Sequence, residues 1–173
     1  MYSGTISNCT LRGNSAGLSG GGAYYAKLYN CLLVGNTGGW QAGGAYAGSL
    51  GNCTIVSNYS GSNGGGGVKD TDGLTNCISW GNDKADNTPR PTYSCGQGAS
   101  YNSGSNFTNN PQFVDSASGN YRLRKESPCV NTGTNGTWTT GAFDLDGRPR
   151  VRDGTVDRGC YEYINPGTIF IVH

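Results

Sequence analysis

The chain has 173 residues and a formal net charge of +1, and charged residues make up only 13% of it. Electrostatic binding of nucleic acid needs clustered lysines and arginines, so we expect no nucleic-acid partner. No apolar run approaches the length of about 18 residues that a transmembrane helix requires, so no membrane span is predicted. The single histidine is the last residue, His173, which argues against histidine-dependent nucleophilic catalysis.

Three markers recur through the first half of the chain with a shared step of about 22 residues. They are the dipeptide Asn-Cys, a Gly-Asn or Ser-Asn pair a few residues later, and a double glycine. A shared period of this length indicates a repeat protein with one structural unit per period. The Asn-Cys dipeptides supply two sets of equivalent residues: Asn8, Asn30, Asn52 and Asn76, and Cys9, Cys31, Cys53 and Cys77.

Each repeat consists of short apolar runs between corners that are rich in glycine and asparagine. The copies align at residues 6–14, 28–36, 50–58 and 74–82. β-Branched and aromatic residues in short runs favour strands, and the helical segment of a leucine-rich repeat is absent. We therefore predict an all-β fold, a right-handed single-stranded parallel β-helix with about four coils of about 22 residues.

Stacking of such coils would place equivalent residues about 4.8 Å apart, one above the next. The four repeated asparagines should then form a ladder whose side-chain amides bond up and down the stack. The four repeated cysteines should form a second ladder of small buried core residues, because free cysteine is among the most buried residue types.

We predict two segments in one structural unit, the coils over residues 1–88 and an irregular C-terminal cap over residues 89–173 that packs on them. The first residues lack the basic and apolar regions of a signal peptide and lead almost directly into the first repeat. We therefore expect further coils upstream in a longer protein. Otherwise the open N-terminal edge would favour end-to-end or edge-mediated self-association.

Two resemblances accompany the repeat. Leu-Arg-Gly-Asn at residues 11–14 with Gly-Gly-Ala at 21–23, and their next copies, resemble the repeats of polymorphic outer-membrane-protein passengers. The second resemblance is to bacterial choice-of-anchor Q proteins, and it covers about residues 92–163. Its motifs include Asn-Asn-Pro-Gln-Phe-Val-Asp at 109–115, Ser-Pro-Cys-Val-Asn-Thr-Gly at 127–133, Asp-Leu-Asp-Gly-Arg-Pro-Arg at 144–150 and Val-Asp-Arg-Gly-Cys-Tyr-Glu at 156–162.

The second resemblance implies a pectate-lyase-like β-helix that is secreted or attached to the bacterial cell surface. That family is defined by its architecture and carries no agreed catalytic set. The resemblance therefore bears on fold and location more than on activity.

Acidic residues are densest near the C-terminus, at Asp144, Asp146, Asp153 and Asp157. The pattern Asp-x-Asp-Gly resembles the start of a calcium loop, so calcium is the one cofactor that the sequence leaves open. The alternative is that these carboxylates pair with nearby arginines and cap turns. The full EF-hand pattern is absent, which favours the alternative.

Three cysteines lie outside the repeat. Cys129 and Cys160 are predicted to form a disulfide in an oxidising compartment, closing a 32-residue loop. Cys95 either pairs with one of them or stays free. Adjacent cysteines of the ladder are poor disulfide candidates, because a flat parallel stack seldom offers the required torsion.

The only charged cluster on the coils is Lys69, Asp70 and Asp72. Pectate-lyase-like enzymes combine acids that bind calcium with a basic residue that abstracts a proton, so these three residues are weak catalytic candidates. The alternative, an exposed corner in a longer repeat, is favoured.

The aromatic residues supply the best argument for binding. Tyr24 and Tyr46 share one repeat position and should stack, and Trp40 lies near them in the sequence. An outward-facing stripe would suit sugar rings or a protein partner, whereas an inward-facing one would belong to the core.

Two functions follow as hypotheses. The first is a non-enzymatic secreted or cell-surface module for adhesion, scaffolding or glycan binding, with a polysaccharide or a surface protein as partner. The alternative is a polysaccharide lyase or glycoside hydrolase, or a fragment of one.

Overall fold

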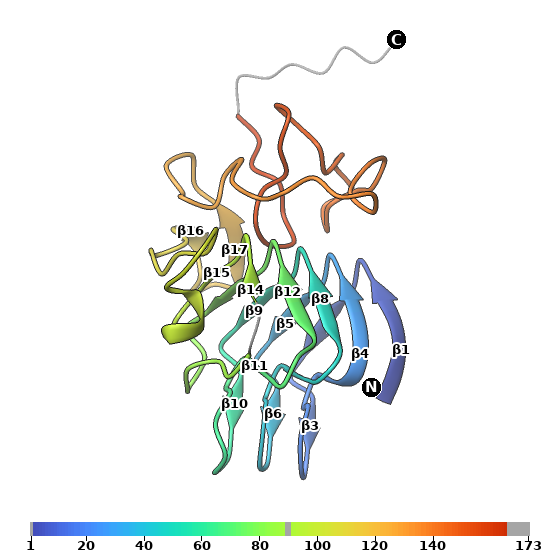
Figure 1. Ribbon diagram of the computed structural model, residues 1–173, viewed down its shortest axis with the longest axis vertical. Coiled ribbons are helices and arrows are strands. Elements are labelled where there is room, and N and C mark those ends of the chain that lie inside the picture. Colours follow the sequence, from blue (N-terminus) through green and yellow to red (C-terminus); the bar gives the residue numbers. More distant parts are fainter. Residues whose placement is uncertain (1, 89–90, 166–173) are drawn as a thin grey trace.

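Short parallel strands make up most of the computed structural model, which describes residues 2–88 and 91–165 (Figure 1). Equivalent residues of successive repeats pair in register, as Leu28 does with Leu50, one step of 22 residues later. The prediction of an all-β parallel solenoid of about four turns is confirmed. Within the described residues the only helical element is one short 3-10 turn, η1 (Ala99–Tyr101).

Three parallel sheets run along the stack. The first contains β1 (Tyr2–Ser7), β4 (Ala23–Tyr29), β7 (Ala45–Tyr46), β8 (Ser49–Gly51), β11 (Val68–Lys69), β12 (Gly73–Thr75) and β14 (Pro91–Thr92). The second contains β2 (Thr10–Arg12), β5 (Leu32–Val34), β9 (Thr54–Val56), β13 (Ile78–Trp80) and β15 (Cys95–Gly96). The third contains β3 (Ser15–Ala16), β6 (Thr37–Gly38) and β10 (Tyr59–Ser60).

Asparagine forms the bend between the first and second sheets. Its φ angle at this corner lies between 47° and 55° in all four coils, at Asn8, Asn30, Asn52 and Asn76. Asparagine tolerates this left-handed conformation better than most residues, because its short amide can bond to nearby backbone. The repeated Asn-Cys dipeptide is therefore first of all a bend signal.

The interior of the solenoid is filled by stacked apolar side chains. Leu28, Leu50 and Leu74 form one column from the first sheet, and Leu33 and Ile55 pair in another from the second. Each is almost wholly buried. Burial of one such side chain stabilises the fold by roughly 1.5–3 kcal/mol.

Tyr101 closes the C-terminal end of this core. Its ring packs so tightly on Gly96 that a Cβ atom there would lie 2.4 Å from the ring. Its hydroxyl donates a 2.7 Å hydrogen bond to the buried carboxylate of Asp86. Strand pairing meanwhile continues past residue 88, because Ile78 pairs with Cys95.

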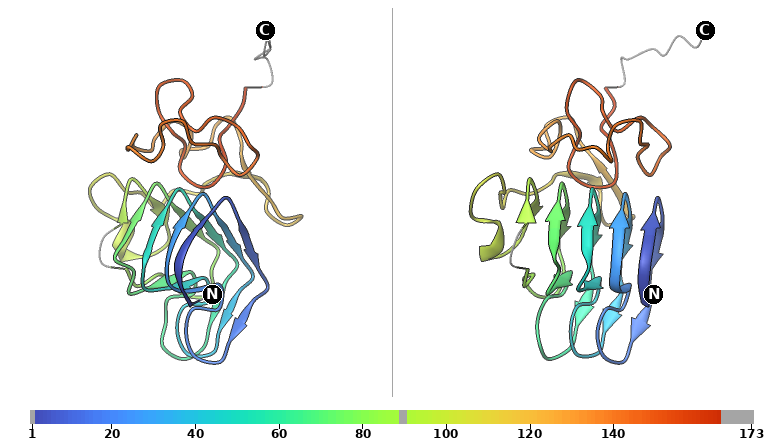
Figure 2. Two further views of the ribbon diagram at one scale, coloured as in Figure 1. Left: turned by 90° about the vertical axis from the view of Figure 1, so that its right-hand side faces the viewer. Right: turned by 45° about the vertical axis from the view of Figure 1, so that its right-hand side comes forward.

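Residues 111–163, which we call the lid, lie along one side of the stack (Figure 2). They are mostly irregular and contain one antiparallel hairpin of β16 (Phe113–Asp115) and β17 (Asn120–Leu123). The lid docks on the asparagine corner: the amides of Asn52 and Asn76 each donate a 2.9 Å hydrogen bond to a lid carbonyl oxygen, that of Asp157 and that of Thr134.

The second sheet is buried on both faces where the lid covers it. Leu33 faces the interior, whereas Leu32 and Val34 pack under the lid, so all of β5 is buried. The lid leaves β2 uncovered, and there Thr10 and Arg12 are exposed. A sheet covered on both faces takes continuous apolar runs instead of alternation, which explains the Leu-Leu-Val sequence.

The predicted asparagine ladder at this corner is only partly bonded. Asn30 donates to Asn8 at 3.1 Å and Asn76 to Asn52 at 2.9 Å, but the amide of Asn52 is directed to the lid. Asn30 also donates to the carbonyl oxygen of Phe143. Lid docking therefore competes with bonding along the stack.

The unbroken amide ladder lies at the opposite corner of the second sheet. There each asparagine side chain donates to the next one at 2.9–3.1 Å. The sequence showed these residues only as a period marker: Asn14, Asn36, Asn58 and Asn82.

The cysteine column is buried as predicted at Cys31, Cys53 and Cys77, whereas Cys9 is exposed because its coil forms the open edge. The column has a fifth rung that the sequence did not reveal. The hydroxyl oxygen of Ser94 accepts a 3.0 Å hydrogen bond from the backbone N–H of Cys77. This rung extends the column into the turn that ends the stack.

Candidate functional site

The three aromatic residues singled out in the sequence line one groove. Tyr24, Trp40 and Tyr46 surround a cavity of about 750 Å³ on the first two coils. The other described residues that line it are small, polar or apolar, and none carries a charge: Ser15, Ala16, Gly17, Leu18, Ser19, Gly20, Gly21 and Gln41.

The repeat itself positions these side chains. Tyr24 and Tyr46 pair in register between β4 and β7, so their rings stack with centroids 5.3 Å apart and planes inclined by 13°. Tyr25 packs against both rings at a steep angle. Stacked aromatic pairs of this kind add about 0.5–1.5 kcal/mol beyond their buried area, so the tyrosine wall is rigid.

The opposite wall consists of loop tips that also follow the repeat. Leu18 is 71% exposed and Trp40 is 49% exposed, and the backbone N–H of Trp40 donates to the carbonyl oxygen of Leu18 at 2.7 Å. Beneath these tips, Ser19 and the buried Gln41 form a 3.3 Å hydrogen bond. Large exposed apolar side chains beside polar groups are typical of a binding surface.

The third coil ends the groove. At the tyrosine position it carries Lys69, which pairs with Tyr46, and at the tip it carries Asn63, whose backbone N–H donates to the Trp40 carbonyl oxygen. The Lys69 ammonium donates a 2.8 Å hydrogen bond to the Asn63 carbonyl oxygen, and the lysine is 7% exposed. The aromatic residues that line the groove thus come from two coils.

The weak catalytic candidates do not come together. The Lys69 ammonium is directed to Asn63, as described above. Asp70 is exposed, has φ of 52° and hydrogen bonds with Tyr46. Asp72 lines a separate cavity of about 260 Å³ beside Trp138. Because Asp70 occupies a left-handed bend, the alternation that would put both carboxylates on one face is broken.

The carboxylate of Asp70 acts on the hydroxyl of Tyr46, which lines the groove. Partial desolvation first, and then the charge and hydrogen bond of the Asp70 carboxylate, raise the pKa of Tyr46 above its ordinary value. The Tyr46 hydroxyl is therefore held in its neutral form. A neutral hydroxyl can donate as well as accept a hydrogen bond.

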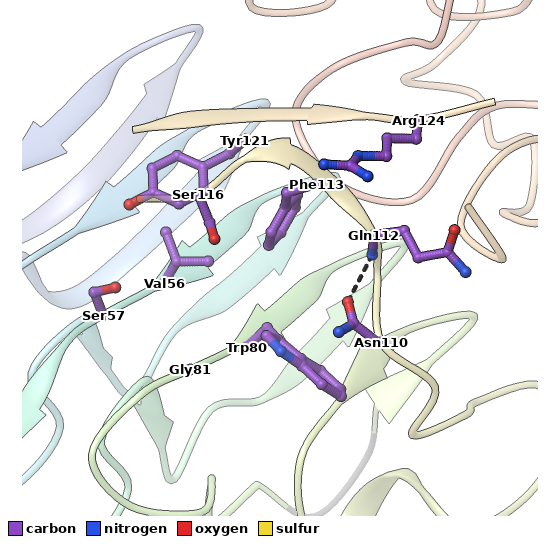
Figure 3. A pocket seen from close by; sticks show the side chains of 10 residues that line it. All are labelled: Val56, Ser57, Trp80, Gly81, Asn110, Gln112, Phe113, Ser116, Tyr121 and Arg124. Atoms are coloured by element: carbon purple, nitrogen blue, oxygen red, sulfur yellow. Dashed lines mark hydrogen bonds between the residues drawn. The ribbon is translucent and has the colours of Figure 1, made fainter. Parts of the chain in front are cut away.

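A second cavity, of about 460 Å³, lies between the lid hairpin and strands β9 and β13 (Figure 3). Trp80 and Phe113 line it together with Tyr121 and Arg124. The Arg124 guanidinium already donates to the carbonyl oxygen of Val114 at 2.8 Å. The sequence could not reveal this cavity, because its walls come from segments that only the folded chain brings together.

The C-terminal aspartates are occupied by protein donors. Asp144 accepts hydrogen bonds from the backbone N–H groups of Asp146, Arg148 and Glu162. Asp157 accepts from those of Asn131 and Tyr163. Both carboxylates therefore act as internal turn caps.

Asp146 forms ion pairs with Arg122 and Arg148, and Asp153 lies in a left-handed turn with φ of 48°. In the described part of the chain, no three Asp, Glu, His or Cys side chains gather as a metal site. The carboxylates that the sequence offered as calcium ligands are Asp144, Asp146 and Asp157. In the structure they pair with arginines and backbone N–H groups, which is the arrangement described by the alternative interpretation.

The predicted Cys129–Cys160 disulfide is wrong for this structure. All seven cysteines lie in the described residues and are free thiols. Cys160 packs with Val56 and Tyr121, and its backbone N–H donates to the Thr54 hydroxyl at 3.1 Å. Cys129 belongs to a different cluster, with Ile78 and Cys95. The two sulfurs therefore lie under different parts of the lid.

In the described residues no helix has the length and apolarity of a membrane span. His173 lies outside the described residues.

In comparisons with known proteins, no family model, no curated protein and no solved structure matches this chain. What the structure establishes is a parallel β-solenoid of about four turns.

Proposed function

We propose that this chain is a non-enzymatic β-solenoid module that binds a neutral glycan in the groove of Tyr24, Trp40 and Tyr46. The single observation that carries the proposal is the lining of this groove: the stacked rings of Tyr24 and Tyr46 and the half-exposed Trp40 border one cavity of about 750 Å³. The location that suits this role is the outside of a bacterial cell, in a secreted or surface-attached protein.

The chemistry of the groove suits a sugar. The apolar C–H face of a pyranose ring packs on aromatic rings, and its hydroxyls need donors and acceptors close by. Here Ser19 and Gln41 supply such groups beside the rings, and the neutral Tyr46 hydroxyl adds another. Small glycines in the loops leave backbone N–H and C=O groups within reach of a ligand.

Charge favours a neutral glycan over an acidic one. None of the described residues that line the groove is cationic, and the nearest charge that acts on it is the Asp70 carboxylate. A polyuronate would meet repulsion there and no compensating cation. Lys69 does not offset this, because its ammonium is capped by the Asn63 carbonyl.

The test is affinity electrophoresis in native gels that contain one soluble polysaccharide each. Hydroxyethyl cellulose, xyloglucan, galactomannan and mixed-linkage β-glucan serve as neutral probes, and polygalacturonate and alginate as acidic ones. We expect retardation by at least one neutral glycan and none by the acidic glycans. Trp40→Ala or Tyr46→Ala should weaken the binding about tenfold, because each removes an aromatic contact worth roughly 1–1.5 kcal/mol.

Tyr59→Ala is the matched control, because Tyr59 is 54% exposed but does not line the groove. It should bind like the unmodified protein. Equal loss in Tyr59→Ala and Tyr46→Ala, or no retardation by any neutral probe, would count against the groove.

The enzymatic alternative makes a different prediction. A polysaccharide lyase or glycoside hydrolase would depolymerise its glycan, with turnover measured as new reducing ends or as absorbance of an unsaturated product. Turnover that disappears in Lys69→Ala or Asp72→Ala would overturn the non-enzymatic proposal. We expect no change in chain length of any probe.

A further inference from the structure

Two buried thiols pack in one apolar cluster where the lid meets the last coil. Cys95 lies in β15, and Cys129 lies in the lid turn that follows Pro128. Both are 0% exposed and pack in one cluster with Ile78 and Leu123. The Cys95 thiol donates a 3.2 Å hydrogen bond to the carbonyl oxygen of Asn109, and Cys129 is its neighbour in this cluster. They belong to segments that are 34 residues apart in the sequence.

Arg158 fixes the distance between these segments. Its backbone N–H donates to the Cys129 carbonyl oxygen at 3.0 Å. Its guanidinium donates to the carbonyl oxygen of Ser94, the residue before Cys95, at 2.9 Å, and stacks 4.0 Å from the centre of the Phe107 ring. One residue therefore ties the backbones on both sides of the thiol pair, so the pair is preorganised.

The cysteines of the column also lie close together, since the backbone N–H of Cys53 donates to the Cys77 sulfur at 3.5 Å, but their arrangement does not suit a disulfide. Neighbours in the column of Cys31, Cys53 and Cys77 sit on stacked parallel coils, whose spacing of about 4.8 Å keeps their Cβ atoms farther apart than the roughly 3.5–4.5 Å of a disulfide. Cys160 lies in the other lid cluster, beside Thr54. Cys95 and Cys129 come instead from two separate elements, a strand of the solenoid and a turn of the lid, and pack in one cluster.

We propose that Cys95 and Cys129 form a disulfide when the protein folds in an oxidising compartment, and that this bond is a covalent latch between the lid and the solenoid. The proposal does not depend on glycan binding. It leaves Cys9, Cys31, Cys53, Cys77 and Cys160 as thiols, which accounts for the odd number of cysteines.

The reaction is a thiol–disulfide exchange with a small disulfide such as oxidised glutathione. One protein thiolate attacks the small disulfide and releases one small thiol, and the second protein thiolate then displaces the other. The S–S bond of the reagent is broken and that of the protein is formed, two electrons pass to the reagent, and the two protein thiol protons end on the released small thiols or in solvent.

Docking of the lid on the solenoid determines when the disulfide can form. Both thiols are buried in the folded protein, and contact with Cys129, followed by burial, raises the pKa of Cys95. A neutral, inaccessible thiol does not react with a dissolved disulfide. The bond therefore forms while the lid is still docking, and once formed it is protected from reductants.

The first test is peptide mapping of protein refolded with a glutathione redox mixture, then alkylated in denaturant and digested without reduction. We expect one linked peptide pair that contains Cys95 and Cys129, and alkylation at the other five cysteines. Alkylation of both Cys95 and Cys129, or a link from Cys129 to Cys160, would overturn the proposal. This measurement needs no variant.

The second test compares melting temperatures of the reduced and oxidised forms. Oxidation should raise the melting temperature by roughly 5–15 °C, the shift expected from closing a loop of this length in a protein of this size. Cys160→Ser, a matched change at an equally buried lid thiol, should keep the shift, whereas Cys95→Ser and Cys129→Ser should lose it. A shift that persists in Cys129→Ser would contradict the latch.

Discussion

The coils and the lid are stabilised in different ways. The coils repeat one pattern of parallel backbone pairing, stacked apolar side chains and an asparagine ladder, and they contain few charges. The lid has one short hairpin and is otherwise irregular, and it buries charged side chains. A periodic structure can satisfy its polar groups by stacking, whereas an irregular one must provide a specific partner for each group.

The buried ion pair of Arg150 and Glu162 is the clearest case of such specific partners in the lid. Arg150 is wholly buried and forms a 3.0 Å ion pair with the equally buried Glu162. Its guanidinium also donates to the carbonyl oxygens of Asp157 and Gly159, each at 3.0 Å. These contacts hold the segment that docks on Asn52 and Thr54.

The largest expected effect is therefore at Arg150. Arg150→Ala removes the guanidinium that pairs with the buried Glu162 carboxylate and donates to two backbone carbonyls, and should lower the free energy of unfolding by about 3–5 kcal/mol above pH 8, where Glu162 is ionised. Arg148→Ala is the control, because its ion pair with Asp146 is 36% exposed on the arginine side and should contribute about 1 kcal/mol or less. Urea unfolding followed by tryptophan fluorescence measures both; equal losses would show that burial of the ion pair is unimportant.

The second-largest expected effect is at Asn52. It separates the stability that comes from lid docking at the asparagine corner from the stability that comes from bonding along the stack. Asn52→Ala removes the hydrogen bond to the Asp157 carbonyl and the acceptor for Asn76, and it places alanine at φ of 47°. We expect a loss of about 2–4 kcal/mol. Asn8→Ala carries the same backbone strain, at φ of 53°, but loses one bond at the open edge, and should cost about 1–2 kcal/mol. If the two variants melt at the same temperature, the lid contributes nothing at this corner.

The smallest expected effect is a pH dependence that comes from the buried carboxylates of the lid. Burial raises the pKa of Glu162 to about 8 and that of Asp157 to about 6, although Arg150 acts in the opposite direction on both. Between the ordinary carboxyl pKa and the raised one, the unfolded chain has released the proton and the folded chain still holds it. The unfolded state then binds fewer protons, so stability falls as pH rises.

We expect the free energy of unfolding to fall by about 1–2 kcal/mol from pH 6 to pH 7. Thermal melts at a series of pH values measure it, and Glu162→Gln should flatten the curve because glutamine does not titrate. A melting temperature that rises over this interval would contradict the assignment.

The periodic half could be predicted from the sequence because its determinants are local. Asparagine and glycine determine the bends, short apolar runs determine the strands, and the constant step determines the register. The sequence of each coil is therefore sufficient to specify its local structure. The same step correctly indicated that Tyr24 and Tyr46 would stack. It could not say whether the rings face outward, because the run Ala-Tyr-Tyr-Ala at residues 23–26 shows no alternation of apolar and polar residues.

What only the tertiary structure decided involves residues far apart in the sequence. The sequence by itself determined a parallel solenoid with a repeated asparagine bend and a buried cysteine column. It did not determine that the C-terminal segment lies along the side of the stack, that Tyr101 closes the core, or that Cys129 packs with Cys95 and not Cys160. Such contacts depend on where an irregular chain returns to the surface of the solenoid, and shape and burial decide that, because no periodic signal encodes it.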